Sequence, residues 1–257
     1  MQASADSRGI GIQRVGLKGV HLPFQILTMQ GDYQNVLGDA TVSVELPKEY
    51  RGTHMSRLME ILLSWRQKPI SGRELRLILT EMTSKLAAPA GDISLRFRYF
   101  LPKTAPVSGS QSYLDYLIET YYRIEGKRHD YVLGVEIPVI SLCPCSKEIA
   151  SNGAHNQRAI IKARVRCPAQ NYIWIEELIA LLEGQGSSPI YPLLKREDEK
   201  YVTENAYAHP KFVEDIVRDA VLALRKEPKV SWFAVECESL ESIHNHSAFA
   251  AHEEAKD

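Results

Sequence analysis

The chain has few cysteines, no excess of positive charge and no long apolar run, and each absence excludes a class of protein. Four cysteines in 257 residues are too few for the disulfide framework of a secreted scaffold. A formal net charge of −1, from 31 basic and 32 acidic residues, does not favour electrostatic binding of nucleic acid. No run reaches the roughly 18 apolar residues of a membrane helix, and residues 1–9 lack the apolar core of a signal peptide. We therefore expect a cytoplasmic protein that binds neither nucleic acid nor membranes.

The hydrophobic patterns that are present predict an α+β protein. After a flexible tail at residues 1–9, a first unit at 10–126 has the order strand, strand, helix, helix, strand, strand. Ser71 and Glu74 form a capping box at the start of its second helix. Alternation of apolar and polar residues marks the strands, and apolar residues at helical spacing mark the helices. Strands are predicted at 12–29, 39–46, 92–100 and 113–124, and helices at 55–63 and 71–86.

The second part of the chain, residues 127–257, repeats this order of elements. Strands are predicted at 130–142, 158–166 and 230–237, and helices at 173–183 and after Pro210. The sequence therefore predicts two tandem ββααββ units in one compact chain. The second unit carries most of the polar clusters from which we derive a site.

The first polar cluster follows the predicted strand that ends near Leu142. Cys143 and Cys145 flank a proline, and His155 follows ten residues after the second cysteine. Thiolate and imidazole are good ligands for zinc-like metals, and a thiolate is also a nucleophile. If the strand continues through both cysteines, their side chains face the same side. The alternative is that each is simply a small buried apolar residue, and no second cysteine pair completes a zinc ribbon.

The second and third clusters add carboxylates and further histidines. Residues 194–204 form a mixed run of Lys, Arg, Asp and Glu, which is either a solvated segment or a place to hold a metal and a polyphosphate together. Near the end of the chain, Glu241 precedes His244 and His246, whose i and i+2 spacing suits a ligand pair or an acid/base pair. The alternative there is a histidine-rich tail without a role. Together the clusters suggest thiolate, imidazole and carboxylate around one divalent ion.

Two smaller signals come from the starts of predicted helices. Residues 52–57 open the first helix, where backbone N–H groups and Arg57 suit a phosphate, although the pattern alone favours an ordinary capped helix start. Glu214 lies at the edge of the apolar stripe of a later helix, either buried at an interface or exposed.

The combination of these motifs resembles the bacterial type IB family of GTP cyclohydrolase I. The motifs that carry the resemblance span most of the chain in one order: Gly52–Arg57, Ser141–Ser146, Gly153–Arg158, Leu194–Arg196 with Asp198–Lys200, Phe212–Asp215 and Glu241–His246. The resemblance implies a tunnelling fold, a homotetramer whose antiparallel sheets close into a barrel, and active sites at subunit interfaces. It also implies hydrolysis of GTP to 7,8-dihydroneopterin triphosphate and formate, the first step of tetrahydrofolate biosynthesis, by a hydrolase that acts on a cyclic amidine C–N bond.

The same resemblance implies roles for individual residues. One divalent metal per site, manganese, zinc or iron, takes Cys145, His155, Glu199 and His244 as ligands, with Cys143 as the rival sulfur ligand. Cys145 and His246 are implied to be catalytic, His246 as a proton donor or acceptor. The residues implied to bind substrate are Glu214 for guanine, the carboxylate Glu241, and Arg57, Arg158, Lys195 and Lys200 for the triphosphate.

The sequence is also compatible with two other functions. A deazaguanine nitrile reductase of the same fold uses a cysteine nucleophile and NADPH, without a metal. A non-catalytic oligomer with a structural zinc site requires a closed set of four ligands and unfolds when the metal is removed. The Glu241–His246 segment favours metal catalysis over the reductase, and Glu214 has no role in the structural zinc protein.

Overall fold

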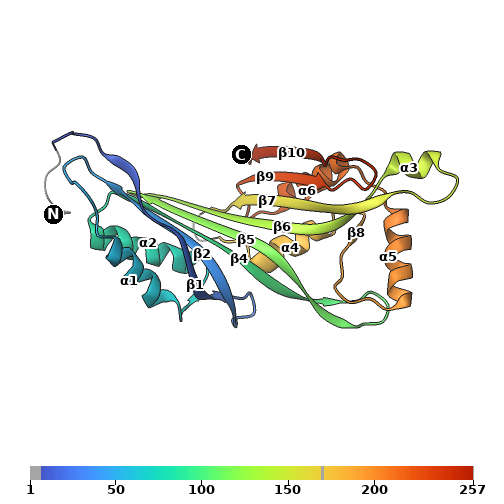
Figure 1. The fold of residues 1–257 in the computed structure, drawn as a ribbon, viewed down its shortest axis with the longest axis horizontal. Coiled ribbons are helices and arrows are strands. Elements are labelled where there is room, and N and C mark those ends of the chain that lie inside the picture. Colours follow the sequence, from blue (N-terminus) through green and yellow to red (C-terminus); the bar gives the residue numbers. More distant parts are fainter. Residues whose placement is uncertain (1–6, 169–170, 257) are drawn as a thin grey trace. The chain divides into compact units, whose positions relative to one another are not determined.

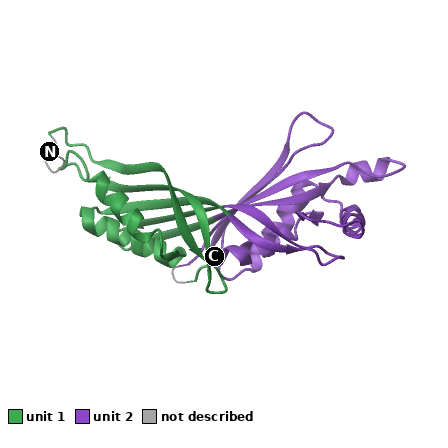
Figure 2. Cartoon of the chain, turned by 60° about the horizontal axis from the view of Figure 1, so that its bottom comes forward, with its two compact units in different colours: residues 1–98, 118–133, 169–172 green, residues 99–117, 134–168, 173–257 purple. Residues whose placement is uncertain are grey.

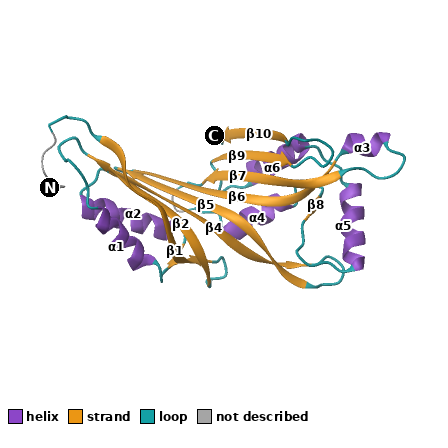
Figure 3. Ribbon diagram, in the orientation of Figure 1, coloured by secondary structure: helices purple, strands orange, loops and turns teal. Residues whose placement is uncertain are grey.

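The computed structural model describes residues 7–168 and 171–256 and has an α+β fold (Figures 1 and 3). The strands are β1 (Ile12–Leu27), β2 (Tyr33–Leu46), β3 (Pro69–Ile70), β4 (Ala90–Thr104), β5 (Gln111–Glu125), β6 (Arg128–Leu142), β7 (Asn156–Arg166), β8 (Ser188–Pro189), β9 (Trp232–Ser239) and β10 (Ala248–Ala255). The helices are α1 (Met55–Trp65), α2 (Gly72–Leu86), α3 (Pro144–Ile149), α4 (Ile175–Glu183), α5 (Arg196–Ala208) and α6 (Val213–Lys226). None of the helices in the described ranges is long and apolar enough to span a bilayer.

All ten strands in the described residues belong to one sheet. Their order is β10-β9-β7-β6-β5-β4-β2-β1-β3, and β8 pairs with β6. Pairing is antiparallel between β1 and β2, β2 and β4, β7 and β9, and β9 and β10, whereas the short β3 runs parallel to β1. The chain divides into two compact units (Figure 2). Unit 1 takes the described residues of 1–98, 118–133 and 169–172, and unit 2 takes 99–117, 134–168 and 173–257.

Helices α1 and α2 cover one face of the strands in unit 1, as predicted from their apolar stripes. The buried residues of both strands and helices lie in alternating or helical register and form the core: Ala40, Val42, Val44, Leu58, Leu62, Leu75, Leu79, Ile93 and Leu95. Gly91 of β4 lies so close to α2 that a Cβ atom there would sit 3.1 Å from the Leu79 side chain. The elements predicted for residues 39–46, 71–86 and 92–100 are thus confirmed.

A buried carboxylate stabilises the opposite face of unit 1. Asp92 of β4 is 1% exposed and accepts hydrogen bonds from Arg14 Nε at 3.1 Å and Ser43 Oγ at 2.6 Å. Arg14 Nη2 also binds Asp92 Oδ1 at 2.5 Å. A buried carboxylate is stable only when charged or polar partners surround it. Here those partners come from β1 and β2, so the contacts join both strands to β4.

The start of α2 offers a direct test of the capping prediction. The Ser71 side chain accepts a hydrogen bond from Arg73 N at 3.2 Å, and Glu74 Oε2 accepts one from Ser71 N at 3.0 Å. Replacing Ser71 by alanine is expected to lower the free energy of unfolding by about 1 kcal/mol, because the helix loses its capping side chain. Chemical denaturation measures this, with Thr80→Ala in the exposed middle of α2 as the control. Equal stability of the Ser71→Ala protein and the parent would contradict the cap's contribution.

Helices α4 and α6 cover the strands of unit 2 in the same way. Buried residues from both helices and from β7 and β9 form its core: Ile161, Val165, Leu178, Leu182, Ile216, Ala220, Leu224, Phe233 and Val235. Polar contacts hold α4 against β4 and β5. Tyr116 Oη donates to Glu183 at 2.7 Å, and Lys103 Nζ lies 2.6 Å from the same carboxylate. Burial, followed by the Glu183 hydrogen bond, raises the pKa of Tyr116, so its hydroxyl stays protonated and donates.

Helices α3 and α5 and strand β10 were not predicted, nor were the two-residue strands β3 and β8. Strand β6 ends at Leu142 and α3 begins at Pro144. Contrary to the expectation, the two cysteines are therefore not alternate residues of one strand. Proline is favoured at the first helical position, which explains the change of structure there. The charged run after Pro192 contains helix α5, and strand β10 follows the histidine segment. The predicted tail falls largely on residues 1–6, outside the described part.

Candidate functional site

The two segments of the cysteine motif are joined through their backbones in unit 2. Cys143 occupies the N-cap position of α3, and its Sγ accepts a hydrogen bond from Ser146 N at 3.4 Å. Cys143 N donates to His155 O at 3.1 Å, and His155 N donates to Ser146 Oγ at 3.2 Å. Cys143 is half-buried, whereas Cys145, inside α3, is exposed. The structure therefore places Cys143 directly beside His155 and leaves Cys145 on the outer surface of the short helix.

The His155 side chain is the start of a hydrogen-bond network that reaches the third motif. His155 Nδ1 lies 2.9 Å from Gln157 Oε1. Gln157 Nε2 in turn donates to Glu241 Oε1 at 3.2 Å and to Ser239 Oγ at 3.1 Å. Ser239 Oγ donates to the same Glu241 oxygen at 3.0 Å. Residues 84 positions apart in the chain are thus connected side chain to side chain.

The two histidines of the third motif lie in the loop between β9 and β10. The rings of His244 and His246 stack with centroids 5.2 Å apart and planes inclined by 13°. Both are exposed, as is Ser242, whose hydroxyl lies 3.3 Å from Gln157 Oε1. The two imidazoles thus lie side by side, but on a bent loop and not on the extended segment that we expected.

Helix α5 positions the charged run. Lys195 stands at its N-cap, and Glu199 and Lys200 are exposed in its first turns. The neighbouring Asp198 is fully buried and accepts hydrogen bonds from Lys195 N at 2.8 Å, Val107 N at 2.8 Å and Ser108 Oγ at 2.6 Å. Burial raises the pKa of Asp198, but the hydrogen bonds from Ser108, Lys195 and Val107 outweigh it and hold the pKa well below its usual range. Asp198 thereby ties the start of α5 to the loop between β4 and β5.

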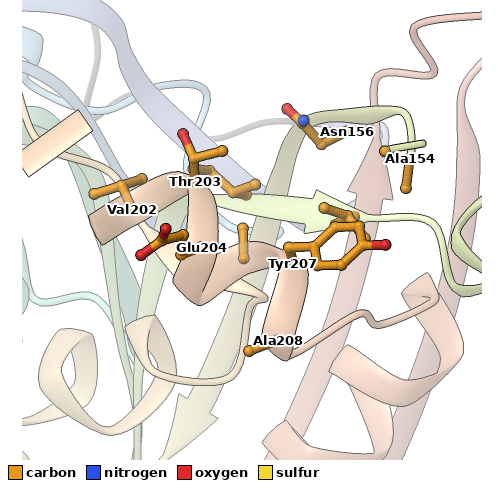
Figure 4. A pocket seen from close by; sticks show the side chains of 11 residues that line it. Ala154, Asn156, Val202, Thr203, Glu204, Tyr207 and Ala208 are labelled. Carbon is orange, nitrogen blue, oxygen red and sulfur yellow. The ribbon is translucent and has the colours of Figure 1, made fainter. Parts of the chain in front are cut away.

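A cavity of about 360 Å³ separates α5 from the loop that carries His155 (Figure 4). Glu204 and Tyr207 of α5 line one side, and Ala154 and Asn156 line the other. A second cavity, of about 240 Å³, is lined by Gln157, Arg158 and Tyr191. Val202 and Asn156 line both cavities, so a concave surface follows α5 next to the His155 loop.

Two predicted substrate residues lie at the starts of other helices. Glu214 is exposed in the first turn of α6. Arg57 is exposed in α1 of unit 1, where its Nη1 donates to Lys85 O at 3.3 Å. Backbone N–H groups at a helix start are free to bind an anion, which suits a phosphate beside Arg57.

The side chains of the site are of the types that bind a divalent cation, but they do not all converge within one chain. Within residues 7–168 and 171–256, no three His, Cys, Asp or Glu side chains converge closely enough to hold a metal. A thiol and an imidazole lie on adjacent backbone segments, and the Gln157 contact occupies only one nitrogen of the imidazole. Such a thiol and imidazole suit zinc-like metals, and the exposed Glu199 supplies the carboxylate that manganese prefers.

Some residues of the site were not found from the sequence. Gln157 and Ser239 connect His155 to Glu241, and Asp198 fixes α5. Gln157 and Asp198 lie inside motifs that we singled out, but amides and serines have no distinctive spacing. Gln157 and Ser239 come together only through strand pairing, because β7 pairs with β9 and Ser239 lies opposite Ala159. Asp198 meets its partners where α5 packs on the loop between β4 and β5.

Comparison with known sequences covers nearly the whole chain. The family model described as type I GTP cyclohydrolase folE2 matches residues 1–250. A protein of Geobacter sulfurreducens named GTP cyclohydrolase FolE2 is 48% identical over 256 residues, which are 100% of this chain and 98% of that protein. Its namesake from Dictyoglomus thermophilum is 47% identical over 251 residues, covering 97% of this chain and 95% of its own length.

Comparison with solved structures supports the tunnelling-type fold. Uricase from Arthrobacter globiformis aligns with a TM-score of 0.56 and 9% sequence identity, over 95% of this chain and 94% of its own. Urate oxidase from Bacillus sp. TB-90 aligns with a TM-score of 0.53 and 10% identity, over 96% of this chain and 100% of its own. At such low identity the likeness concerns the fold alone.

Proposed function

Because the chain belongs to the type I GTP cyclohydrolase FolE2 family, its substrate is GTP, and we propose that it forms 7,8-dihydroneopterin triphosphate and formate by metal-dependent hydrolysis. The resemblance found in the motifs thus holds for GTP cyclohydrolase I, and the family that matches is named FolE2 rather than type IB. As in that resemblance, the reaction is the first step of tetrahydrofolate biosynthesis and breaks a cyclic amidine C–N bond. A cytoplasmic location stays a prediction.

The observation that carries the proposal is the convergence of three motifs on His155. The cysteine segment meets it through backbone hydrogen bonds, and Glu241 meets it through Gln157. A thiol, an imidazole and a carboxylate from distant parts of the chain therefore share one end of unit 2. These are the side-chain types that a metal-dependent hydrolase needs as ligands and as proton donors or acceptors.

We assign the metal to a sulfur ligand, His155, His244 and Glu199, with manganese, zinc or iron as the ion. These residues would hold the cation, which would supply Lewis-acid activation of water for attack on C8 of the purine. The backbone pairing with His155 favours Cys143 as the sulfur ligand, and exposed Cys145 then serves as a catalytic thiol. The reverse assignment, with Cys145 as the ligand, is the alternative.

The remaining residues bind substrate and move protons. His246, stacked on His244, exchanges protons with the sugar during its rearrangement, because an imidazole can both donate and accept a proton. The Glu214 carboxylate accepts hydrogen bonds from the guanine N1–H and amino group. Glu241 orients the site through Gln157. We assign the triphosphate to Arg57, Arg158, Lys195 and Lys200, because their side chains are positively charged.

A complete site on this proposal needs more than one copy of the chain. The predicted ligands do not converge within the described residues of one chain, which supports sites shared between subunits of a homotetramer. We also propose that the chain consists of two ββααββ units with a boundary near residue 126. In the tetramer the sheets would close into a barrel.

The test is turnover of GTP by metal-stripped protein, with and without added Mn²⁺ or Zn²⁺. We expect formate release and the fluorescence of the oxidised pterin only after metal is restored. Size-exclusion chromatography with light scattering establishes that the stripped protein is folded and oligomeric. Absence of turnover with any metal, from such protein, would overturn the proposal.

The same samples separate the two rival functions. A deazaguanine nitrile reductase would oxidise NADPH and form a thioimide adduct without metal. A structural zinc protein would unfold when the metal is removed and would release no formate.

A further inference from the structure

The side chain of Gln157 uses every hydrogen bond that an amide can make. Its Oε1 lies 2.9 Å from His155 Nδ1 and 3.3 Å from Ser242 Oγ. Its Nε2 lies 3.2 Å from Glu241 Oε1 and 3.1 Å from Ser239 Oγ. An amide has two donor hydrogens and two acceptor lone pairs, so no capacity is left over.

The partners of Gln157 fix the direction of its amide. The Glu241 carboxylate can only accept hydrogen bonds. Ser239 Oγ donates its one hydrogen to the same carboxylate at 3.0 Å, so it can only accept from Gln157. Glu241 and Ser239 therefore both accept hydrogen bonds from Gln157, and the NH₂ group of its amide must face them. The reversed amide would set its oxygen against the carboxylate oxygen.

With the amide fixed, the hydrogen on His155 is fixed too. The Gln157 oxygen lies 2.9 Å from His155 Nδ1, nearer than the Ser242 hydroxyl at 3.5 Å, so this nitrogen carries the hydrogen that it shares with Gln157. In a neutral imidazole the other nitrogen, Nε2, then holds the lone pair. Ligation or proton acceptance by His155 takes place at Nε2 alone.

We propose that Gln157 is a positioning residue that transmits the acceptor character of Glu241 to His155 and holds the imidazole in its Nδ1–H form. This inference rests on the proposed function, in which His155 is a metal ligand. Ligating histidines are commonly oriented by a partner at the other ring nitrogen, and loss of that partner costs about 10- to 100-fold in metal affinity. Here an amide takes that place, and a carboxylate orients the amide.

The experiment measures Zn²⁺ affinity by chelator competition in Gln157→Leu, in His155→Ala and in the double variant Gln157→Glu with Glu241→Gln. We expect Gln157→Leu to bind Zn²⁺ about 10- to 100-fold more weakly than the parent. The double variant exchanges the two groups, so an acceptor again faces His155 Nδ1 and an amide donor again faces a carboxylate. It is expected to recover most of the affinity, which loss of packing alone would not allow.

A second readout needs no metal. In the metal-free parent labelled with ¹⁵N at histidine, the neutral His155 imidazole is expected to carry its hydrogen on Nδ1, with the signal assigned by its loss in His155→Ala. Gln157→Leu is expected to shift it toward the Nε2–H form. A parent imidazole protonated at Nε2 would overturn the proposal, and so would parent-like affinity in Gln157→Leu.

The variants also separate this inference from the proposed function. Parent-like Zn²⁺ affinity in His155→Ala would remove His155 from the metal site. Weak binding in His155→Ala with parent-like binding in Gln157→Leu would keep the metal site and remove the role of Gln157.

Discussion

Replacement of His155 by alanine is expected to abolish GTP turnover and to weaken metal binding beyond the roughly 100-fold that loss of a hydrogen-bonding partner costs. The backbone of His155 is hydrogen-bonded to the cysteine segment, and its side chain contacts Gln157, the partner of Glu241. Its removal therefore takes away a ligand and the group that the network orients. Metal content after gel filtration and formate release measure the two losses in the same preparation.

The two cysteines provide the matched comparison for this prediction. Cys143→Ser is expected to lose metal together with turnover, because it removes the thiol that lies on the segment bonded to His155 and that we assign as the sulfur ligand. Cys145→Ser is expected to keep its metal and lose turnover, because Cys145 is exposed on α3. His244→Ala should lower metal content as well. Parent-like stoichiometry in both histidine variants would contradict the ligand assignment, and metal lost only in Cys145→Ser would reverse the roles of the thiols.

Long-range features of the fold followed from the sequence where periodicity was strong. Residues 39–46 and 92–100 alternate strictly, and they form paired parts of β2 and β4. Helix α5 was missed because its only buried residues are Asp198, Val202 and Ala206, which give too narrow an apolar stripe to recognise. Strand β10 was missed for a related reason, since its half-buried alanines scarcely differ in polarity from their neighbours.

The site was predictable in residue type and less so in geometry. Thiols and imidazoles stand out in a sequence because few residues offer that chemistry. The alternating pattern does not show the step from strand to helix at Pro144, which separates the two cysteines that alternation predicts on one side. Gln157 has no chemical signature until β7 and β9 bring Ser239 and Glu241 beside it. Orienting residues of this kind depend on strand register, which a motif does not contain.

Replacement of Asp198 by alanine is expected to lower the melting temperature by roughly 5 to 10 °C at neutral pH. The fully buried carboxylate accepts hydrogen bonds from Lys195 N, Val107 N, Ser108 N and Ser108 Oγ. Alanine leaves these donors without their acceptor and releases the start of α5 from the loop between β4 and β5. Lys195 and Glu199 lie at that end of the helix, so turnover should fall together with stability.

The effect of Asp198 also has a defined dependence on pH. Hydrogen bonds hold the pKa of Asp198 in the folded protein below its value in the unfolded chain. Its contribution to stability is therefore complete above the unfolded pKa of about 4 and is lost as the pH falls toward the folded pKa. The difference in melting temperature between the parent and Asp198→Ala should be constant from pH 7 to about 5 and should shrink at lower pH. Glu197→Ala, at an exposed neighbouring carboxylate, is the control and should leave the melting temperature unchanged. A difference that persists undiminished below pH 4 would show that packing, rather than the ionised carboxylate, holds α5 in place.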